Sequence, residues 1–194
     1  MEPSSDGGER VDKKHAARSL VIVSGAPGAG KTSVAVPLAA ELGFGLVYKD
    51  RLKETLHDAL GAPEPDLAWS RRLGAAAMEL LWALAADAPR VVIEANFRPR
   101  SGFERDKLAE LACRAAAVEV YCACPARIAL RRYNERGPGR HPVHLRRSLR
   151  PEAMDEYDGP VGIGELITLD TAVDVDIAAL AAEVRERLHR GAMF

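Results

Sequence analysis

The segment from Gly25 to Thr32 constrains this chain more than any other part of its sequence. It reads Gly-Ala-Pro-Gly-Ala-Gly-Lys-Thr, which is the Walker A pattern of a glycine, four residues and Gly-Lys-Thr. It follows the apolar run 20–23 and precedes a helix-like segment. Glycines allow successive N–H groups to converge on a phosphate, and the next helix directs its positive end at the same anion. The segment therefore predicts a site for a nucleoside triphosphate.

Each residue type in this loop has a physical role. Lys31 would reach the β- and γ-phosphates, and Thr32 would place its hydroxyl on Mg²⁺. The alternative is a glycine-rich turn between a strand and a helix that binds nothing. The residues expected to hold the nucleotide here are Gly25, Ala26, Pro27, Gly28, Ala29, Gly30, Lys31, Thr32 and Ser33.

Length and charge limit the other functions of the chain. At 194 residues it suits one domain, and a formal charge of −1 gives no overall field that would attract nucleic acid or a membrane surface. No apolar stretch approaches the roughly 18 residues that span a bilayer, and no signal peptide is visible, so we expect a cytoplasmic protein. Residues 1–18 are polar and predict a disordered tail, and the domain is expected to cover 19–194.

Strand-like and helix-like segments alternate through the rest of the chain. This order predicts an α/β fold, a three-layer P-loop sandwich with a five-stranded parallel sheet. Ligands in such folds lie at the carboxyl ends of the strands, which would bring the glycine loop, Asp50, 94–98 and Pro125 to one rim. We expect strands at 20–24, 45–48, 90–94, 118–122 and 165–170, and helices at 31–42, 51–60, 67–86, 101–116 and 176–190.

Two carboxylates stand at expected strand ends. Asp50 would face the triphosphate and accept a proton from an attacking hydroxyl, or it would act as a helix N-cap. Glu94 could hold a metal-bound water, contact the acceptor, or share the role of base with Asp50; alternatively it is a solvated turn residue. Asn96 could bind a phosphate or a substrate hydroxyl, and Arg98 could clamp an acceptor or lie in solvent.

The segment 125–160 is rich in arginine and is interrupted by proline and glycine. A helix would place Arg127 and Arg131 on one face, and Arg132 and Arg136 on the neighbouring stripe. Because this segment follows the fourth strand, we expect an arginine-rich helical lid that stabilises charge on a transferred phosphoryl group. The alternative is a solvated basic face. Binding of RNA is less favoured, because aromatic residues do not alternate with the arginines.

Histidines, cysteines and the last strand end provide weaker signals. His141 and His144 lie three residues apart, but no further ligand stands at a spacing typical of zinc, so we expect them to contact substrate or solvent. The cysteines 113, 122 and 124 are expected to be buried thiols near a strand end. Asp170 and Thr171 lie where the adenine of a bound nucleotide would pass, or they form a cap or turn.

Taken together, these motifs resemble the small P-loop kinases, and within them the group that contains chloramphenicol phosphotransferase and the zeta toxins. The resemblance rests on 25–32, Asp50, 94–97, the arginine-rich segment 127–141 and 169–171. It implies transfer of the γ-phosphate of ATP, with Mg²⁺, to a hydroxyl of a small molecule. A monomer or homodimer is expected. No guanine-reading Asn-Lys-x-Asp motif is present, which by similarity argues against a GTPase.

The same resemblance assigns roles to individual residues. Lys31 would bind ATP, Asp50 would be the base, and Arg131 and Arg136 would cover the phosphates; Thr32 would bind Mg²⁺, with Glu94 acting through a water. The nucleotide-binding set then also includes Arg127, Asp170 and Thr171. The residues expected to contact the acceptor are Asp50, Arg51, Glu94, Asn96, Arg98 and His141.

The identity of the acceptor stays open at this point. A metabolite, or an antibiotic inactivated for resistance, is the first hypothesis. The second is a toxin-like kinase that acts on an activated sugar nucleotide, and the third is a regulatory protein in which ATP only switches conformation.

Overall fold

Five strands and six α-helices alternate along the part of the chain that the computed structural model describes, residues 18–61, 66–136, 139–145 and 148–191. The expected tail lies, except for Arg18, outside these residues. The strands are β1 (Ser19–Ser24), β2 (Gly45–Tyr48), β3 (Arg90–Glu94), β4 (Ala116–Ala123) and β5 (Glu165–Asp170). The helices are α1 (Lys31–Leu42), α2 (Lys49–Leu60), α3 (Leu67–Asp87), α4 (Gly102–Ala112), α5 (Ala126–Glu135) and α6 (Ile177–Gly191), with a 3₁₀ turn at Pro151–Tyr157.

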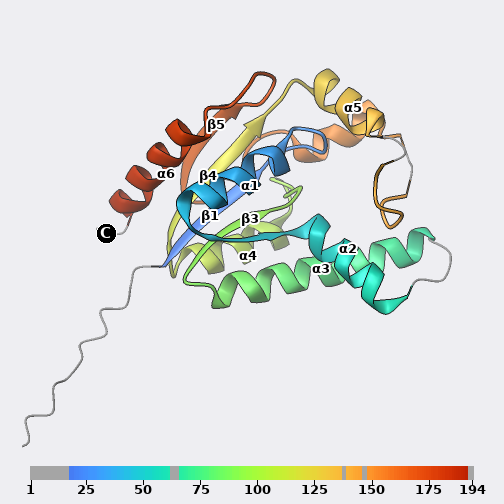
Figure 1. Ribbon diagram of the computed structural model, residues 1–194, viewed down its shortest axis with the longest axis horizontal. Coiled ribbons are helices and arrows are strands. Elements are labelled where there is room, and N and C mark those ends of the chain that lie inside the picture. Colours follow the sequence, from blue (N-terminus) through green and yellow to red (C-terminus); the bar gives the residue numbers. More distant parts are fainter. Residues whose placement is uncertain (1–17, 62–65, 137–138, 146–147, 192–194) are drawn as a thin grey trace, which may run out of the picture.

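The strands form one parallel sheet in the order β2-β3-β1-β4-β5, which confirms the predicted α/β fold. β1 is central, and the chain crosses from one side of it to the other between β3 and β4 (Figure 1). A crevice at the carboxyl ends of the strands is expected where the strand order reverses in this way. The sheet therefore places the glycine loop, which follows β1, at its centre.

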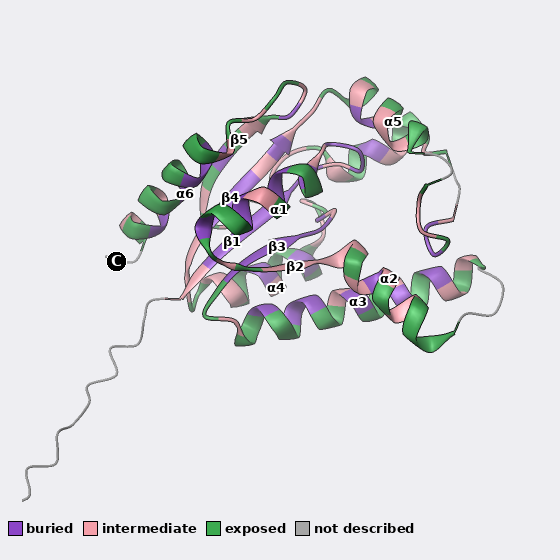
Figure 2. Ribbon diagram, in the orientation of Figure 1, coloured by how far each residue is buried: buried purple, intermediate pink, exposed green. Residues whose placement is uncertain are grey.

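Helices cover both faces of the sheet and bury two apolar cores. On one face, α1 and α6 pack over β1 and β4 through residues such as Leu38 and Val184. On the other face, α3 and α4 pack over β1 and β3 through residues such as Leu81 and Leu108. The central strands β1 and β3 are mostly buried, whereas the edge strands β2 and β5 and the outer sides of the helices are more exposed (Figure 2). No helix within the described ranges combines the length and apolar character needed to cross a membrane.

Several element boundaries differ from the prediction for identifiable reasons. Tyr48 is the N-cap of α2, so Asp50 lies inside the first turn and the N-cap interpretation of Asp50 is wrong. α4 ends at Ala112 rather than at 116, because Ala116 already pairs with Ser19 in the sheet. Cys113 is exposed at the end of α4, which corrects the expectation of a buried thiol there.

Helix α1 continues through Pro37, although proline cannot donate the usual backbone hydrogen bond. It begins after Gly30 and ends at Gly43, and both glycines have left-handed backbone angles. The N–H of Gly43 donates to the last carbonyls of the helix, which is the common glycine stop. The glycines at its two ends therefore set the bounds of α1, and Pro37 does not interrupt the helix.

A fully buried carboxylate fixes the chain that enters β5. Glu119, in the middle of β4, accepts hydrogen bonds from the Ser24 hydroxyl at 2.5 Å and from the N–H groups of Val161 and Gly162, each at 2.8 Å. The N–H of Ile163 lies 3.4 Å from the same carboxylate. A charged acceptor satisfied in this way stabilises a segment that has no regular structure of its own. Sequence periodicity gives no sign of this role.

Replacing Glu119 by alanine is expected to destabilise the fold strongly. The change leaves several buried N–H donors without an acceptor, which costs about 3 kcal/mol or more. The free energy of unfolding in urea measures this loss, and Glu110→Ala on the exposed side of α4 is the matched control. A loss no larger than that of Glu110→Ala would show that the segment 161–163 does not depend on this carboxylate.

Candidate active site

The glycine loop between β1 and α1 is pressed against β4 and α5, so two of its glycines cannot be replaced. Gly25 has φ +134°, and a Cβ there would lie 2.7 Å from the carbonyl oxygen of Cys122. Gly28 has φ +83°, and a Cβ there would overlap the carbonyl oxygen of Ala129 in α5. Close approach and left-handed backbone angles therefore explain these glycines independently of any ligand.

Lys31 begins α1 and is a buried cation, only 5% exposed. Its ammonium donates to the carbonyl oxygen of Ala26 at 2.8 Å and to Oδ1 of Asn96 at 2.5 Å. Burial lowers the pKa of Lys31, and the charges of Glu94 and Asp50 oppose this effect. The loop thus holds a buried ammonium group with two hydrogen-bond acceptors, and a bound anion would replace only a small number of existing contacts.

Thr32 and Glu94 form the second contact of the loop with β3. The Thr32 hydroxyl donates to Oε2 of Glu94 at 2.9 Å. Burial raises the pKa of Glu94, opposed by the charge of Lys31 and by this hydrogen bond. Oxygen donors of this kind are the ligands that Mg²⁺ prefers, usually one or two side chains with the remaining positions left to water and phosphate. The pair fits Mg²⁺.

Asp50 shares a small cavity with these groups. Its carboxylate is 3.4 Å from Nζ of Lys49 and its side chain is 39% exposed. Burial raises the pKa of Asp50, but the charges of Lys49, His144 and Arg140 outweigh it, so the net pKa is lowered. The carboxylate is therefore ionised at neutral pH. The cavity is lined by Pro27, Gly28, Gly30, Lys31, Thr32, Asp50, Glu94, Asn96, Tyr133, Arg136 and Arg140.

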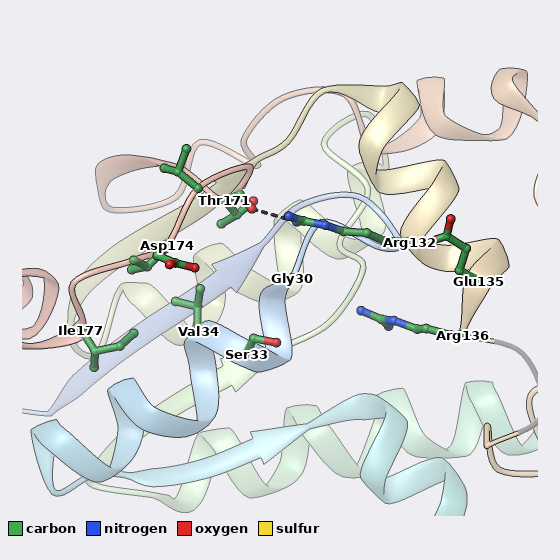
Figure 3. A pocket seen from close by; sticks show the side chains of 11 residues that line it. Gly30, Ser33, Val34, Arg132, Glu135, Arg136, Thr171, Asp174 and Ile177 are labelled. Atoms are coloured by element: carbon green, nitrogen blue, oxygen red, sulfur yellow. Dashed lines mark hydrogen bonds between the residues drawn. The ribbon is translucent and has the colours of Figure 1, made fainter.

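A larger cavity of about 570 Å³ adjoins the small one (Figure 3). Gly30 and Arg136 line both. Its volume lies in the range of small-ligand pockets. Arg132 crosses it and donates to the carbonyl oxygen of Thr171 at 2.8 Å, the bond drawn in Figure 3. The other lining residues are Ser33, Val34, Glu135, Val173, Asp174, Val175 and Ile177.

The arginines of α5 and of its C-cap, Arg136, divide between two faces. Arg132 and Arg136 line the larger cavity. Arg131 is two-thirds exposed and lies 3.9 Å from Glu135, and Arg127 is exposed. Neither of these two residues lines the two cavities described above. The structure therefore brings Arg136 to the glycine loop, whereas Arg131 and Arg127 lie outside it.

The remaining predicted contact residues lie outside both cavities as well. Arg98 is bound by Glu104, with its guanidinium 2.6 Å from the carboxylate, an interaction that fixes the start of α4. Arg51 is exposed on α2, and Asp170 accepts from the N–H of Ala172 in a turn. His141 contacts Asp58 at 3.0 Å.

Sequence reasoning missed Arg140 at the small cavity and Lys49 beside Asp50. Arg140 lines this cavity and places its guanidinium 4.6 Å from the ring centre of Tyr133, which lines the same cavity. Lys49 is the nearest cation to Asp50. A basic residue directly before a strand-end aspartate was the available signal for Lys49. Arg140 follows residues 137–138, which lie outside the described part, and only its place in space identifies it.

A second buried lysine joins three segments beside Asp50. Nζ of Lys53 donates to Oγ of Ser70 at 2.7 Å, and that hydroxyl donates to the carbonyl oxygen of Val143 at 2.9 Å. Lys53 is 8% exposed, and burial, helped by the charge of Lys49, lowers its pKa to about 8. The relay ties α2 to α3 and to the segment 139–145.

Lys53→Met is expected to change how stability depends on pH. The unfolded chain keeps this proton up to a pKa of about 10.5, whereas the folded chain releases it near 8, so the stability of the wild type rises with pH between these values. Urea unfolding at about pH 7.5 and about pH 9.5 measures that rise, which should be smaller in Lys53→Met. Lys107→Met, at a lysine of α4 whose side chain is 38% exposed, should retain this rise with pH. Equal slopes in the wild type and Lys53→Met would contradict the buried-cation interpretation.

Comparisons with known proteins place this geometry in context. The structure is similar to that of a candidate kinase from Chloroflexus aurantiacus, with a TM-score of 0.75 and 27% identity over 89% of this chain and 99% of that one. It shares its fold with a shikimate kinase from Acinetobacter baumannii, solved with shikimate (TM-score 0.55, 19% identity, 90% and 95% coverage). It also shares it with the APS kinase of Mycobacterium tuberculosis, solved with AMPPNP and APS (0.51, 24%, 89% and 98%). No curated protein matches the sequence.

The fold is thus the kinase-like P-loop fold, and its neighbours include kinases of small molecules. The family model described as AAA domain matches residues 20–158, which include the glycine loop, Asp50, Glu94 and α5. Since that match covers more than half of the sequence, the chain belongs to the AAA domain family.

Proposed function

We propose that this protein is an ATP-dependent phosphotransferase that moves the γ-phosphoryl group to a hydroxyl of a small molecule. One observation carries the proposal: the ionised carboxylate of Asp50 lines the same small cavity as Lys31 and Thr32 of the glycine loop. A protein that only binds or hydrolyses a nucleotide has no need of an additional strand-end carboxylate facing this loop. A phosphotransferase needs one to orient the attacking hydroxyl.

The two adjoining cavities suit the two parts of the donor. The larger one, between α1, α5 and the chain after β5, has room for a nucleoside, and apolar side chains such as Val173 and Ile177 line it. The phosphates would then cross Gly30 and Arg136, which line both cavities, and reach the backbone N–H groups of the loop. Lys31 would exchange its present partner Asn96 for phosphate oxygens.

Thr32 and Glu94 are the residues that would hold Mg²⁺, Thr32 through its hydroxyl and Glu94 through a water. When bound, this ion neutralises charge on the phosphates. The assignment leaves Asp50 as the base. Glu94 already accepts from Thr32 and has a raised pKa, whereas Asp50 is exposed enough to meet an acceptor hydroxyl. A lowered pKa does not disqualify Asp50, because phosphoryl transfer needs a group that orients the hydroxyl more than a strong base.

Charge on the transferred group would be stabilised by Arg136 and Arg140, which line this cavity from the C-cap of α5 and from the segment after it. The segment 125–160 would serve as the lid. The acceptor is proposed to be a metabolite or an antibiotic, in line with the resemblance to the group that contains chloramphenicol phosphotransferase.

Asp50→Asn is expected to abolish most of the transfer while leaving ATP binding intact. Removal of a positioned proton acceptor lowers kcat about 100-fold or more, whereas the dissociation constant of an ATP analogue should not change. ADP release from ATP is first measured with wild-type protein across a panel of hydroxyl compounds, including sugar nucleotides. The compound that stimulates it is then used to compare Asp50→Asn with Asp106→Asn, an exposed control on α4.

Two results would contradict the proposal. Full activity of Asp50→Asn would remove Asp50 as the base and turn attention to Glu94. Tight ATP binding by the wild type without stimulation by any acceptor would favour the regulatory interpretation instead.

Arg136→Ala and Arg131→Ala separate the two faces of α5. Arg136 lines both cavities, and the loss of one charge-assisted contact to phosphate should raise the dissociation constant of a non-hydrolysable ATP analogue about tenfold. Arg131 lines neither, so Arg131→Ala should bind as the wild type does. Isothermal titration calorimetry measures both constants. A larger loss in Arg131→Ala than in Arg136→Ala would require the lid to rearrange on binding.

A further inference from the structure

Outside the proposed active site, three metal-ligating side chains meet where α2 faces the segment 139–145. They are His57 and Asp58 near the end of α2 and His141 in the segment, and one ligand atom from each lies within 4.8 Å of the other two. Nε2 of His141 is 3.0 Å from Oδ1 of Asp58, and Nδ1 of His57 is 3.5 Å from the same oxygen. The two imidazole rings are edge to face with centres 5.1 Å apart.

His57 supplies an independent sign that this cluster is incomplete. Both of its ring nitrogens are buried, and neither has a hydrogen-bond partner among the described residues. The contact of Nδ1 with Asp58 at 3.5 Å does not have the geometry of a hydrogen bond. Buried imidazole nitrogens are normally satisfied, because leaving one unpaired costs about 1–3 kcal/mol. An unpaired nitrogen beside a carboxylate and a second imidazole points to an absent cation.

We infer that His57, Asp58 and His141 form a binding site for Zn²⁺ that joins α2 to the segment 139–145. Two imidazole nitrogens and one carboxylate oxygen are a ligand set that zinc prefers and that Mg²⁺ and Ca²⁺ do not. Ligands about 2.0–2.1 Å from a tetrahedral centre lie about 3.3 Å from each other. The Asp58 oxygen lies 3.0 and 3.5 Å from the two imidazole nitrogens, and all three ligand atoms lie within 4.8 Å of one another. Asp58 is 68% exposed, so its outer side leaves the fourth position to water.

Neighbouring groups define which atoms take part. His144 lies with its ring centre 6.4 Å from that of His141, but its Nε2 contacts Glu54 at 3.0 Å and is therefore not a ligand. Nδ1 of His141 accepts the N–H of Val143 at 3.2 Å, which leaves the proton on Nε2. Zinc binding must displace this Nε2 proton. The proton moves to Nδ1, so that His141 binds as a neutral imidazole, and the long bond from the N–H of Val143 breaks.

The location of the site gives the ion a structural consequence. Arg140, which precedes His141, lines the small cavity, and α2 carries Asp50 in its first turn. Bound Zn²⁺ would therefore hold the arginine that faces the phosphates in a fixed position relative to the helix of the proposed base.

Direct metal titration tests the site without reference to activity. Full-length protein freed of metal with a chelator is titrated with Zn²⁺ by calorimetry in excess Mg²⁺, so that the oxygen ligands at Thr32 and Glu94 are occupied. Co²⁺ is used in parallel, because its visible absorption reports ligand type and number. We expect one Zn²⁺ per chain. His57→Asn and His141→Asn should each weaken binding at least about tenfold, since even outer partners of metal ligands are worth that much.

His189→Asn, on α6, is the control and should bind Zn²⁺ like the wild type. Thermal unfolding in a chelator shows whether each variant folds, and Zn²⁺ should raise the midpoint of the wild type but not of His57→Asn or His141→Asn. Unchanged affinity in folded His57→Asn and His141→Asn overturns the site. Loss of Zn²⁺ binding in Asp50→Asn alone would also overturn it, by assigning the ion to the active site.

Discussion

The arrangement at the carboxyl ends of β1 and β3 depends on the burial of one ammonium group. Lys31 is held in a position where water cannot solvate it, and burial lowers its pKa. The fold compensates with the carbonyl of Ala26, the amide oxygen of Asn96 and the nearby charge of Glu94. Each of these groups lies at the end of β1 or β3 or within two residues of it, so the compensation is possible only because β1 and β3 are neighbours in the sheet.

The same strand order explains why Asp50 belongs to this site. β2 pairs with β3 in a register that sets Tyr48 opposite Glu94, and α2 starts at the next residue. Asp50 is therefore in the first turn of a helix, where the positive end of the helix and Lys49 both favour the ionised carboxylate. Two carboxylates at adjacent strand ends thus have opposite environments: the pKa of Glu94 is raised and that of Asp50 is lowered. Environments that push two pKa values apart allow two roles, here metal binding and acceptance of a proton.

Much of the fold could be predicted because the local signals are strong. The strands at 45–48, 90–94 and 165–170 and the helix at 31–42 have the predicted bounds, since apolar runs and glycine stops define them without tertiary help. What could not be predicted depends on long-range contacts. Ala116 joins the sheet instead of α4 because Ser19 lies opposite it. The metal-ligating cluster joins His141 to His57 and Asp58, and Asp58 lies 83 residues before His141 in the sequence. Sequence spacing alone therefore could not identify the other zinc ligands of His141.

For helix α5, the sequence pattern predicts a basic helix but not which of its arginines face the phosphate site. Four arginines on two stripes predict a basic helix, but the sequence does not say which stripe faces the glycine loop. The structure decides through Ala129, the buried residue of α5, whose carbonyl oxygen lies against Gly28. Arg132 and Arg136 stand three and seven residues after Ala129 and share its face, whereas Arg127 and Arg131 stand two residues to either side and lie opposite. A glycine that lets the helix approach the loop therefore also selects which arginines face the loop.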